Sequence, residues 1–134
     1  MRSVLLIDDD ANTLLALGVR LKAMGYTVFT AKDAVGATSA ARKNSPDIIV
    51  LDISLPGGDG FTVAERLQRL GSTGATPIIF ITASENPDLR KRAMQMGAVG
   101  FLKKPFDANQ MAEAIEMALS PGDTWQPQVT QSKA

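Results

Sequence analysis

Acidic side chains follow the first and third short apolar runs of this 134-residue chain. Asp8, Asp9 and Asp10 come directly after the run VLLI, and Asp52 comes directly after IIVL. Three consecutive carboxylates repel one another, and a helix N-terminus needs only one of them as a cap. A divalent cation explains the cluster better, because Mg²⁺ binds one or two carboxylates together with water and phosphate oxygens. The expected chemistry is that of phosphate and a hard cation.

A hydroxyl group and an ammonium group follow two further apolar runs. Thr82 comes after IIFI, and Lys104 comes shortly after VGFL. A phosphoryl group on a carboxylate carries anionic oxygens, and a cation, an ammonium and a hydroxyl donor each stabilise that charge during transfer. Taken singly, Thr82 is better explained as a strand-end hydroxyl and Lys104 as a solvated surface lysine. Together with Asp52 and the acidic cluster, they favour a phosphoryl site.

The composition excludes several other kinds of site. The sequence has no Cys and no His, so any metal must be a hard cation bound by oxygen atoms. Its 14 basic and 14 acidic residues balance, whereas a nucleic-acid-binding face needs an excess of Lys and Arg. No apolar run approaches the length of a bilayer span, and the first run is too short for a signal peptide.

Short apolar segments alternate with longer segments of helical spacing. Five short segments, rich in β-branched residues and bounded by turn residues, are typical of strands: 4–7, YTVFT at 26–30, 48–51, 78–81 and 99–102. Between them, apolar residues three or four positions apart mark the buried faces of helices. The clearest faces are Leu14/Leu17/Leu21, Val63/Leu67/Leu70, Leu89/Ala93/Met96 and Met111/Ile115/Ala118.

The order βαβαβαβαβα predicts an α/β fold with a five-stranded parallel sheet and helices on both faces. The YTVFT segment alternates more than the others, so we expect it at an edge of the sheet. Ligands of an open parallel sheet bind outside the carboxyl ends of the strands. Because polar groups follow four of the five predicted strands, this fold should gather them at one edge.

Capping residues mark where several helices begin and end. Asp10 is expected to cap the first helix, and Asn86 before Pro87 predicts another helix start. Asp107 and Gln110 resemble a capping box. Three glycines directly after periodic stretches are predicted to end helices in the left-handed conformation: Gly25, Gly71 and Gly97.

These motifs, in this order, resemble the receiver domain of two-component response regulators. The matching segments are VLLIDDD (4–10), PDIIVLDISLPGGDGF (46–61), PIIFITA (77–83) and GAVGFLKKPF (97–106). The resemblance implies a flavodoxin-like, doubly wound fold with strand order 2-1-3-4-5 and a receiver domain at residues 1–120. Residues 121–134 contain two Pro and several polar residues without periodicity, which predicts a flexible tail or the start of a linker.

The resemblance also implies a Mg²⁺ site. Asp8 and Asp9 would form its acidic pair. Asp9, Asp52 and the backbone carbonyl of Ser54 would be the direct protein ligands.

The groups around the phosphate take their expected roles from the same resemblance. Asp52 would be the phosphoacceptor, Thr82 the switch hydroxyl and Lys104 the phosphate-binding lysine. Adjacent side chains of a strand point to opposite faces, so Lys103 should point away from the site. Phe101 would be the aromatic residue that turns inward on activation. The surface formed by the fourth helix, the fifth strand and the fifth helix would then switch.

The implied partners are a sensor histidine kinase or a histidine phosphotransfer protein and a downstream protein target. The family implies a cytoplasmic location, no binding of nucleic acid or membrane by this domain, and no enzyme activity beyond its own phosphotransfer and dephosphorylation. The identity of kinase and target, the oligomeric state and any further domain stay open.

Three alternative functions each match part of the sequence. Asp8-x-Asp10 resembles the nucleophile motif of haloacid-dehalogenase-type phosphohydrolases, which would place the phosphate on Asp8. That family needs a later acidic pair, but only Asp107 and Asp123 follow Lys104 here. A receiver-like module that no longer takes phosphate is disfavoured because every site residue is present. A dinucleotide-binding domain is excluded because no G-x-G-x-x-G follows the first strand.

Overall fold

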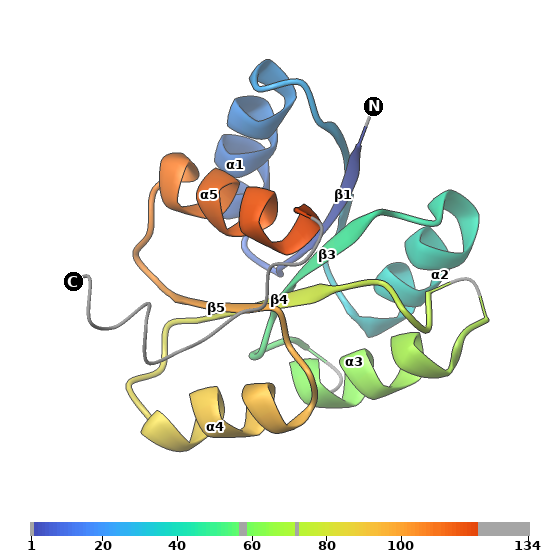
Figure 1. The fold of residues 1–134 in the computed structure, drawn as a ribbon, viewed down its shortest axis with the longest axis vertical. Coiled ribbons are helices and arrows are strands. Elements are labelled where there is room, and N and C mark those ends of the chain that lie inside the picture. The colour runs from blue at the N-terminus through green and yellow to red at the C-terminus, as the bar shows by residue number, and fades with distance from the viewer. Residues whose placement is uncertain (1, 57–58, 72, 121–134) are drawn as a thin grey trace.

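The computed structural model describes residues 2–56, 59–71 and 73–120, in which five strands alternate with five helices (Figure 1). In chain order they are β1 Ser3–Ile7, α1 Ala11–Ala23, β2 Thr27–Ala31, α2 Ala34–Asn44, β3 Ile48–Asp52, α3 Gly60–Arg69, β4 Ile78–Thr82, α4 Pro87–Gln95, β5 Gly100–Lys103 and α5 Ala108–Leu119. The segment predicted as a tail, 121–134, lies outside the described residues.

The strands form one parallel sheet in the order β2-β1-β3-β4-β5, which confirms the predicted flavodoxin-like topology. The predicted edge strand, β2, lies at the edge beside β1. β1 is paired on both sides, with Val4 opposite Val28 of β2 and Ile48 of β3. β5 begins and ends one residue later than predicted. Because all five strands run the same way, their carboxyl ends meet at one edge.

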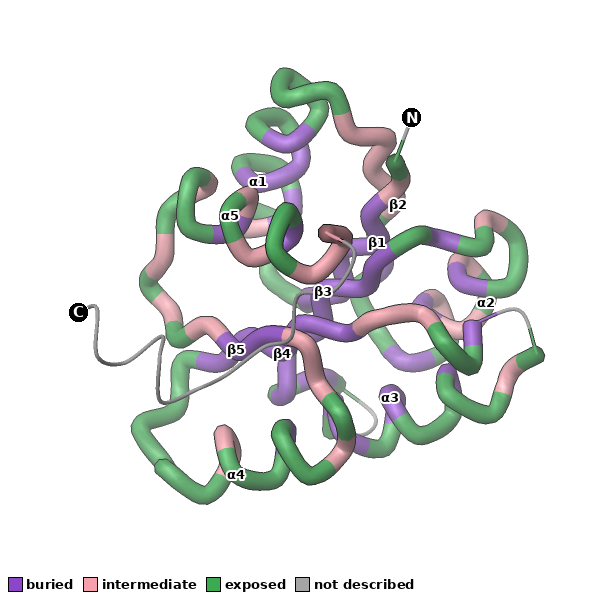
Figure 2. Tube along the Cα trace, viewed as in Figure 1, coloured by how far each residue is buried: buried purple, intermediate pink, exposed green. Residues whose placement is uncertain are grey.

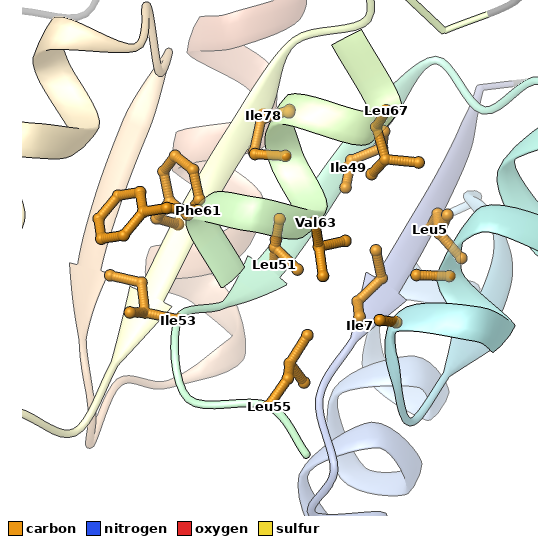
Figure 3. Close-up of a cluster of buried hydrophobic side chains, with 14 of the residues drawn as sticks. Leu5, Ile7, Ile49, Leu51, Ile53, Leu55, Phe61, Val63, Leu67 and Ile78 are labelled. Atoms are coloured by element: carbon orange, nitrogen blue, oxygen red, sulfur yellow. The ribbon is translucent and has the colours of Figure 1, made fainter. Parts of the chain in front are cut away.

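Two apolar layers hold helices on both faces of the sheet, and the strands between them are largely buried (Figure 2). α1 and α5 cover one face, where Leu17, Leu21 and Ile115 pack against alternate strand residues. α2, α3 and α4 cover the other face, where Val63 and Leu67 belong to the cluster drawn in Figure 3. None of the described helices is long and apolar enough to cross a membrane.

Most of the predicted caps are confirmed. Asp10 caps α1, and Asn86 caps α4 ahead of a Pro in its first turn. The capping box at the start of α5 has both of its hydrogen bonds. Gly25 and Gly97 have φ values of +101° and +84°, which are left-handed and favour glycine.

The predicted left-handed cap at Gly71 is wrong. α3 ends at Arg69, the next residue Leu70 is extended, and Gly71 has no left-handed φ. The buried hydroxyl of Thr73 donates to the carbonyl of Leu67 at 2.8 Å. A carbonyl in the last turn is thus satisfied by a side chain that follows the helix, so no left-handed glycine is needed.

Candidate functional site

Two buried carboxylates lie side by side at the carboxyl edge of the sheet. Asp8 directly follows β1, and Asp52 is the last residue of β3. β1 and β3 are neighbours whose pairing runs up to Ile7 opposite Leu51, so the next residues in register are these two aspartates. Both are almost completely buried, with exposed fractions of 1% and 4%. The pairing of two apolar strands therefore brings two like charges together.

Asp9 completes a group of three carboxylates that suits a hard cation. One oxygen from each of Asp8, Asp9 and Asp52 lies within 4.8 Å of the others, and Asp9 is exposed. Oxygen donors of this kind are the ligands that Mg²⁺ and Ca²⁺ prefer. The residues present thus fit the cation that the sequence implied.

Asp10, the third acid in the sequence run, has a different task. Its carboxylate accepts hydrogen bonds from the Thr13 hydroxyl at 2.9 Å and from the Asn12 amide at 3.0 Å. The Thr13 hydroxyl and the Asn12 amide lower the pKa of Asp10 below its usual value. As predicted, Asp10 caps α1, which leaves Asp8 and Asp9 for the site.

Lys104 supplies the positive charge that the two buried carboxylates need. Its Nζ donates to Asp8 Oδ2 at 2.8 Å and to Asp52 Oδ2 at 2.9 Å. Burial lowers the pKa of Lys104, but hydrogen bonds to both carboxylates outweigh burial and raise it. Lys103 points elsewhere and pairs with exposed Glu85. The structure therefore distinguishes the two lysines as strand alternation predicted.

The environment of Asp52 both raises its pKa and fixes its orientation. Burial is the main cause of the raised pKa, and the nearby Asp8 charge adds to it, while the Lys104 and Ser54 donors oppose it. The Ser54 amide donates to Asp52 Oδ1 at 2.8 Å. Each carboxylate oxygen is thus held by one donor, Oδ1 by an amide and Oδ2 by an ammonium. The role of the Ser54 carbonyl as a metal ligand stays a prediction.

Thr82 lies one strand away from Asp52. It is the last residue of β4, buried, and follows Ile81, which is opposite Asp52 in the sheet. Its Oγ1 accepts from the Ser84 amide at 3.0 Å, and its carbonyl accepts from the Lys104 amide at 2.7 Å. The backbone of β4 therefore positions the lysine whose ammonium lies between the two buried carboxylates.

Two arginines of α4 lie over aromatic rings of other elements, contacts that the sequence pattern does not predict. The guanidinium carbon of Arg90 lies 4.8 Å from the ring centre of Phe101, and that of Arg92 lies 4.3 Å from the ring centre of Phe61. Arg90, Lys91 and Arg92 are consecutive in α4, a run that by itself indicates a solvated basic face. No local signal shows that an arginine on an exposed helix face also covers a ring of another element.

Comparison with known sequences identifies the family. The response regulator receiver domain model matches residues 4–116. The chain is 34% identical over 123 residues to the DNA-binding dual master transcriptional regulator RpaA of Synechocystis, covering 92% of this chain and 51% of that protein. It is 38% identical over 104 residues to the response regulator PleD of Caulobacter vibrioides, covering 78% of this chain and 23% of that protein. The chain thus spans about half the length, or less, of these curated relatives.

Comparison with solved structures agrees with the family that the sequence comparison identifies. The chemotaxis response regulator CheY4 of Vibrio cholerae superposes with a TM-score of 0.82 at 28% identity, covering 89% of this chain and 99% of that one. The non-phosphorylated HemR receiver domain of Leptospira biflexa gives 0.81 at 32% identity, covering 90% and 95%. With its acidic pocket and Lys104 in the arrangement typical of a phosphoacceptor site, this chain belongs to the response regulator receiver family.

Proposed function

We propose that Asp52 accepts a phosphoryl group from a histidine kinase or histidine phosphotransfer protein, with Mg²⁺ bound by Asp9, Asp52 and the Ser54 carbonyl and with Asp8 completing the acidic pair. The observation that carries this proposal is one ammonium, Lys104, bonded to two buried carboxylates that share a cation site with Asp9. We place the receiver domain at 1–120 and the protein in the cytoplasm. It acts as a phosphoacceptor signalling domain rather than a classical enzyme.

The transfer itself needs little covalent chemistry from the protein. An Asp52 carboxylate oxygen forms a bond to phosphorus as the bond from phosphorus to the donor's imidazole nitrogen breaks, and the imidazole keeps the electron pair. Asp9, Asp52 and the Ser54 carbonyl would hold a Mg²⁺ ion, which when bound would neutralise charge on the phosphoryl oxygens. The two donors on Asp52 hold its carboxylate in one orientation, so less orientational entropy is lost when the donor arrives.

Lys104 and Thr82 respond to the charge that phosphorylation adds. The phosphoryl group brings anionic acceptor oxygens to Asp52. The Lys104 ammonium is already 2.9 Å from Asp52 Oδ2, so it reaches a phosphoryl oxygen by a small movement. The Thr82 hydroxyl donates to another. Movement at Thr82 and along β5 then changes the surface of α4, β5 and α5, and a downstream protein binds to this changed surface.

The names of the relatives describe whole proteins of about twice this length or more. RpaA is named as DNA-binding, whereas this chain has balanced charge and matches the receiver model over residues 4–116. We therefore assign this domain a protein target and no direct contact with nucleic acid or membrane.

Mass spectrometry after treatment with acetyl phosphate tests the function. The protein should gain one phosphoryl group on Asp52, only when Mg²⁺ is present, and Asp52→Asn should abolish the gain. Asp88→Asn, which changes an exposed carboxylate at the start of α4, is the matched control and should label normally. Labelling that survives in Asp52→Asn and disappears in Asp8→Asn would instead support the phosphohydrolase alternative.

A further inference from the structure

Helix α4 has a small apolar face, and two of its arginines lie over aromatic rings of neighbouring elements. Of its residues only Ala93 is buried, and Leu89 is half-buried against the same cluster. Arg90 and Arg92 extend to different neighbours: Arg90 covers the ring of Phe101 on β5, and Arg92 covers that of Phe61 on α3. A helix with so small an apolar face depends on such side contacts for its position.

Phe61 is connected to the backbone of the phosphoacceptor. The preceding Gly60 donates its amide to the carbonyl of Ile53 at 2.6 Å, and a Cβ at Gly60 would lie 2.7 Å from Ile53 Cα and overlap the Asp52 carbonyl. Phe61 itself is buried beside Phe80, with ring centres 5.0 Å apart. Figure 3 shows Phe61 and Ile53 in the same buried cluster. A movement of the backbone at Asp52 therefore moves the ring under Arg92.

Phe101 is connected to Lys104, on the β5 side of the site. It lies opposite Phe80 in the sheet, on the strand that leads to Lys104. Its neighbour Arg90 has a buried Nη1 without a hydrogen-bond partner among the described residues. The guanidinium of Arg90 instead contacts the face of the Phe101 ring, with its central carbon 4.8 Å from the ring centre. Burial also lowers the pKa of Arg90.

We infer that Arg90 and Arg92 of α4, with the rings of Phe101 and Phe61, form an aromatic clamp that couples the position of α4 to the two segments leaving the phosphorylation site. Arg92 contacts Phe61, which is connected to the segment after Asp52, and Arg90 contacts Phe101 of β5. Arg92 is a positioning residue, because it touches a ring and not the site itself. The signalling role of the clamp rests on the proposed phosphorylation of Asp52.

A contact couples α4 to phosphorylation only if its free energy differs between the unphosphorylated and the phosphorylated protein. A cation over a ring meets this condition, because its attraction depends on the ring lying within about 6 Å and beneath the charge. The two rings lie on different elements, α3 and β5. A displacement of either one changes the contact on one side of α4 only, so the helix is shifted or loosened.

Amide hydrogen exchange of the unphosphorylated protein tests the clamp without any phosphate. Arg92→Met keeps a long apolar stem but removes the charge, and it should speed exchange of the α4 amides about two- to fivefold. Lys91→Met, which removes one charge from an exposed position of the same helix, should leave them unchanged. In a Phe61→Leu background, Arg92→Met should have no further effect. Equal exchange in the two single variants would overturn the clamp.

Amide chemical shifts with Mg²⁺ and beryllofluoride, a mimic of the phosphoryl group, test the coupling. In the natural protein the mimic should shift two groups of amides, those next to Thr82 and Lys104 and those within α4. In Arg92→Met the changes around Thr82 and Lys104 should persist, whereas those in α4 should fall to about half or less. Undiminished α4 changes in this variant would overturn the coupling and leave Asp52 as phosphoacceptor. A natural protein that does not respond to the mimic would instead contradict the proposed function, and the exchange experiment would still decide whether the clamp holds α4.

Discussion

The ammonium group of Lys104 holds one positive charge between two buried carboxylates. At this residue scale, the sheet forces Asp8 and Asp52 together, and like charges in a poorly solvated place are costly unless a cation is shared between them. The proposed divalent cation would therefore compensate the same negative charge as Lys104. On the proposed function, the ammonium would share the two carboxylates with that cation and could follow a phosphoryl oxygen on Asp52.

Lys104→Met should bind Mg²⁺ more tightly and be less stable without it. The ammonium no longer competes for Asp8 and Asp52, so calorimetric titration should show a lower dissociation constant. Without metal, two adjacent buried carboxylates lose their partner, and the free energy of unfolding should fall by about 1–3 kcal/mol, since Lys104 is partly exposed. Excess Mg²⁺ should restore most of this loss.

Lys103→Met is the matched control for that experiment. Its ammonium pairs with exposed Glu85 outside the site, so both Mg²⁺ affinity and stability should stay close to those of the natural protein. An equal change in both lysine variants would mean that general charge, and not the position of Lys104, controls metal binding.

At the scale of elements, the start of α3 packs directly on the end of β3. Gly60 is the contact point, because the Asp52 carbonyl and Ile53 Cα leave no room for a side chain there. Gly60→Ala should lower the free energy of unfolding by about 1–3 kcal/mol and slow phosphoryl acceptance, since the backbone that carries Asp52 must shift. Urea denaturation and acetyl phosphate labelling measure the two effects.

Gly71→Ala is the control for the same helix. A Cβ at Gly71 meets nothing within 4 Å, and its backbone is not left-handed, so stability and labelling should be retained. A loss comparable to that of Gly60→Ala would show that the end of α3 needs glycine after all.

The hydroxyl of Tyr26, the residue before β2, donates a hydrogen bond to Glu116 Oε1 of α5 at 2.6 Å. Burial, and then this bond to a carboxylate, raise the pKa of Tyr26 to about 12. The chain has one tyrosine, so phenolate absorbance reports this group alone. The folded protein should titrate near 12, and Glu116→Gln should lower the midpoint but leave it above 10.0, because burial remains. Glu113→Gln, also exposed on α5, should leave it unchanged.

The same pKa sets the sign of the pH dependence of stability. Above pH 10.0 the unfolded chain loses the Tyr26 proton while the folded chain keeps it up to about pH 12. The folded state then binds more protons than the unfolded state, so the free energy of unfolding falls as pH rises through this window. Below it, Tyr26 adds no pH dependence. Denaturation at several pH values should show a smaller fall in Glu116→Gln.

At the scale of the whole molecule, one sheet separates two apolar clusters, and the last helix closes the second of them. Met111 and Ile115 of α5 are completely buried against it, and the Leu119 carbonyl accepts from the Arg2 side chain at 3.1 Å. A chain ending at Ser120 contains all of these contacts. It should keep its free energy of unfolding to within about 1 kcal/mol in urea and should still label on Asp52. A chain ending before α5 should not fold, because the second cluster loses its cover.

The sequence by itself determined the elements and most of the residues that cap them. Apolar periodicity is a local property, so it predicted five strands, the helices between them and most of their caps. In a parallel sheet the carboxyl ends of the strands share one edge. For that reason Asp52, Thr82 and Lys104 were predicted to meet, although they are far apart in the chain. The strand order and the role of each residue came from the family resemblance and not from the pattern.

Only the tertiary structure decided contacts between side chains of different elements. The end of α3 needs no left-handed Gly71, because the Thr73 hydroxyl donates to the Leu67 carbonyl. Which donor reaches a carbonyl depends on what the fold brings near it. Lys104 bridges two carboxylates, and the exposed Arg92 lays its guanidinium over the ring of Phe61. A long charged side chain has many rotamers, and the partner that selects one of them lies on another element. The rotamer that such a side chain adopts therefore depends on distances between elements, which no local sequence pattern contains.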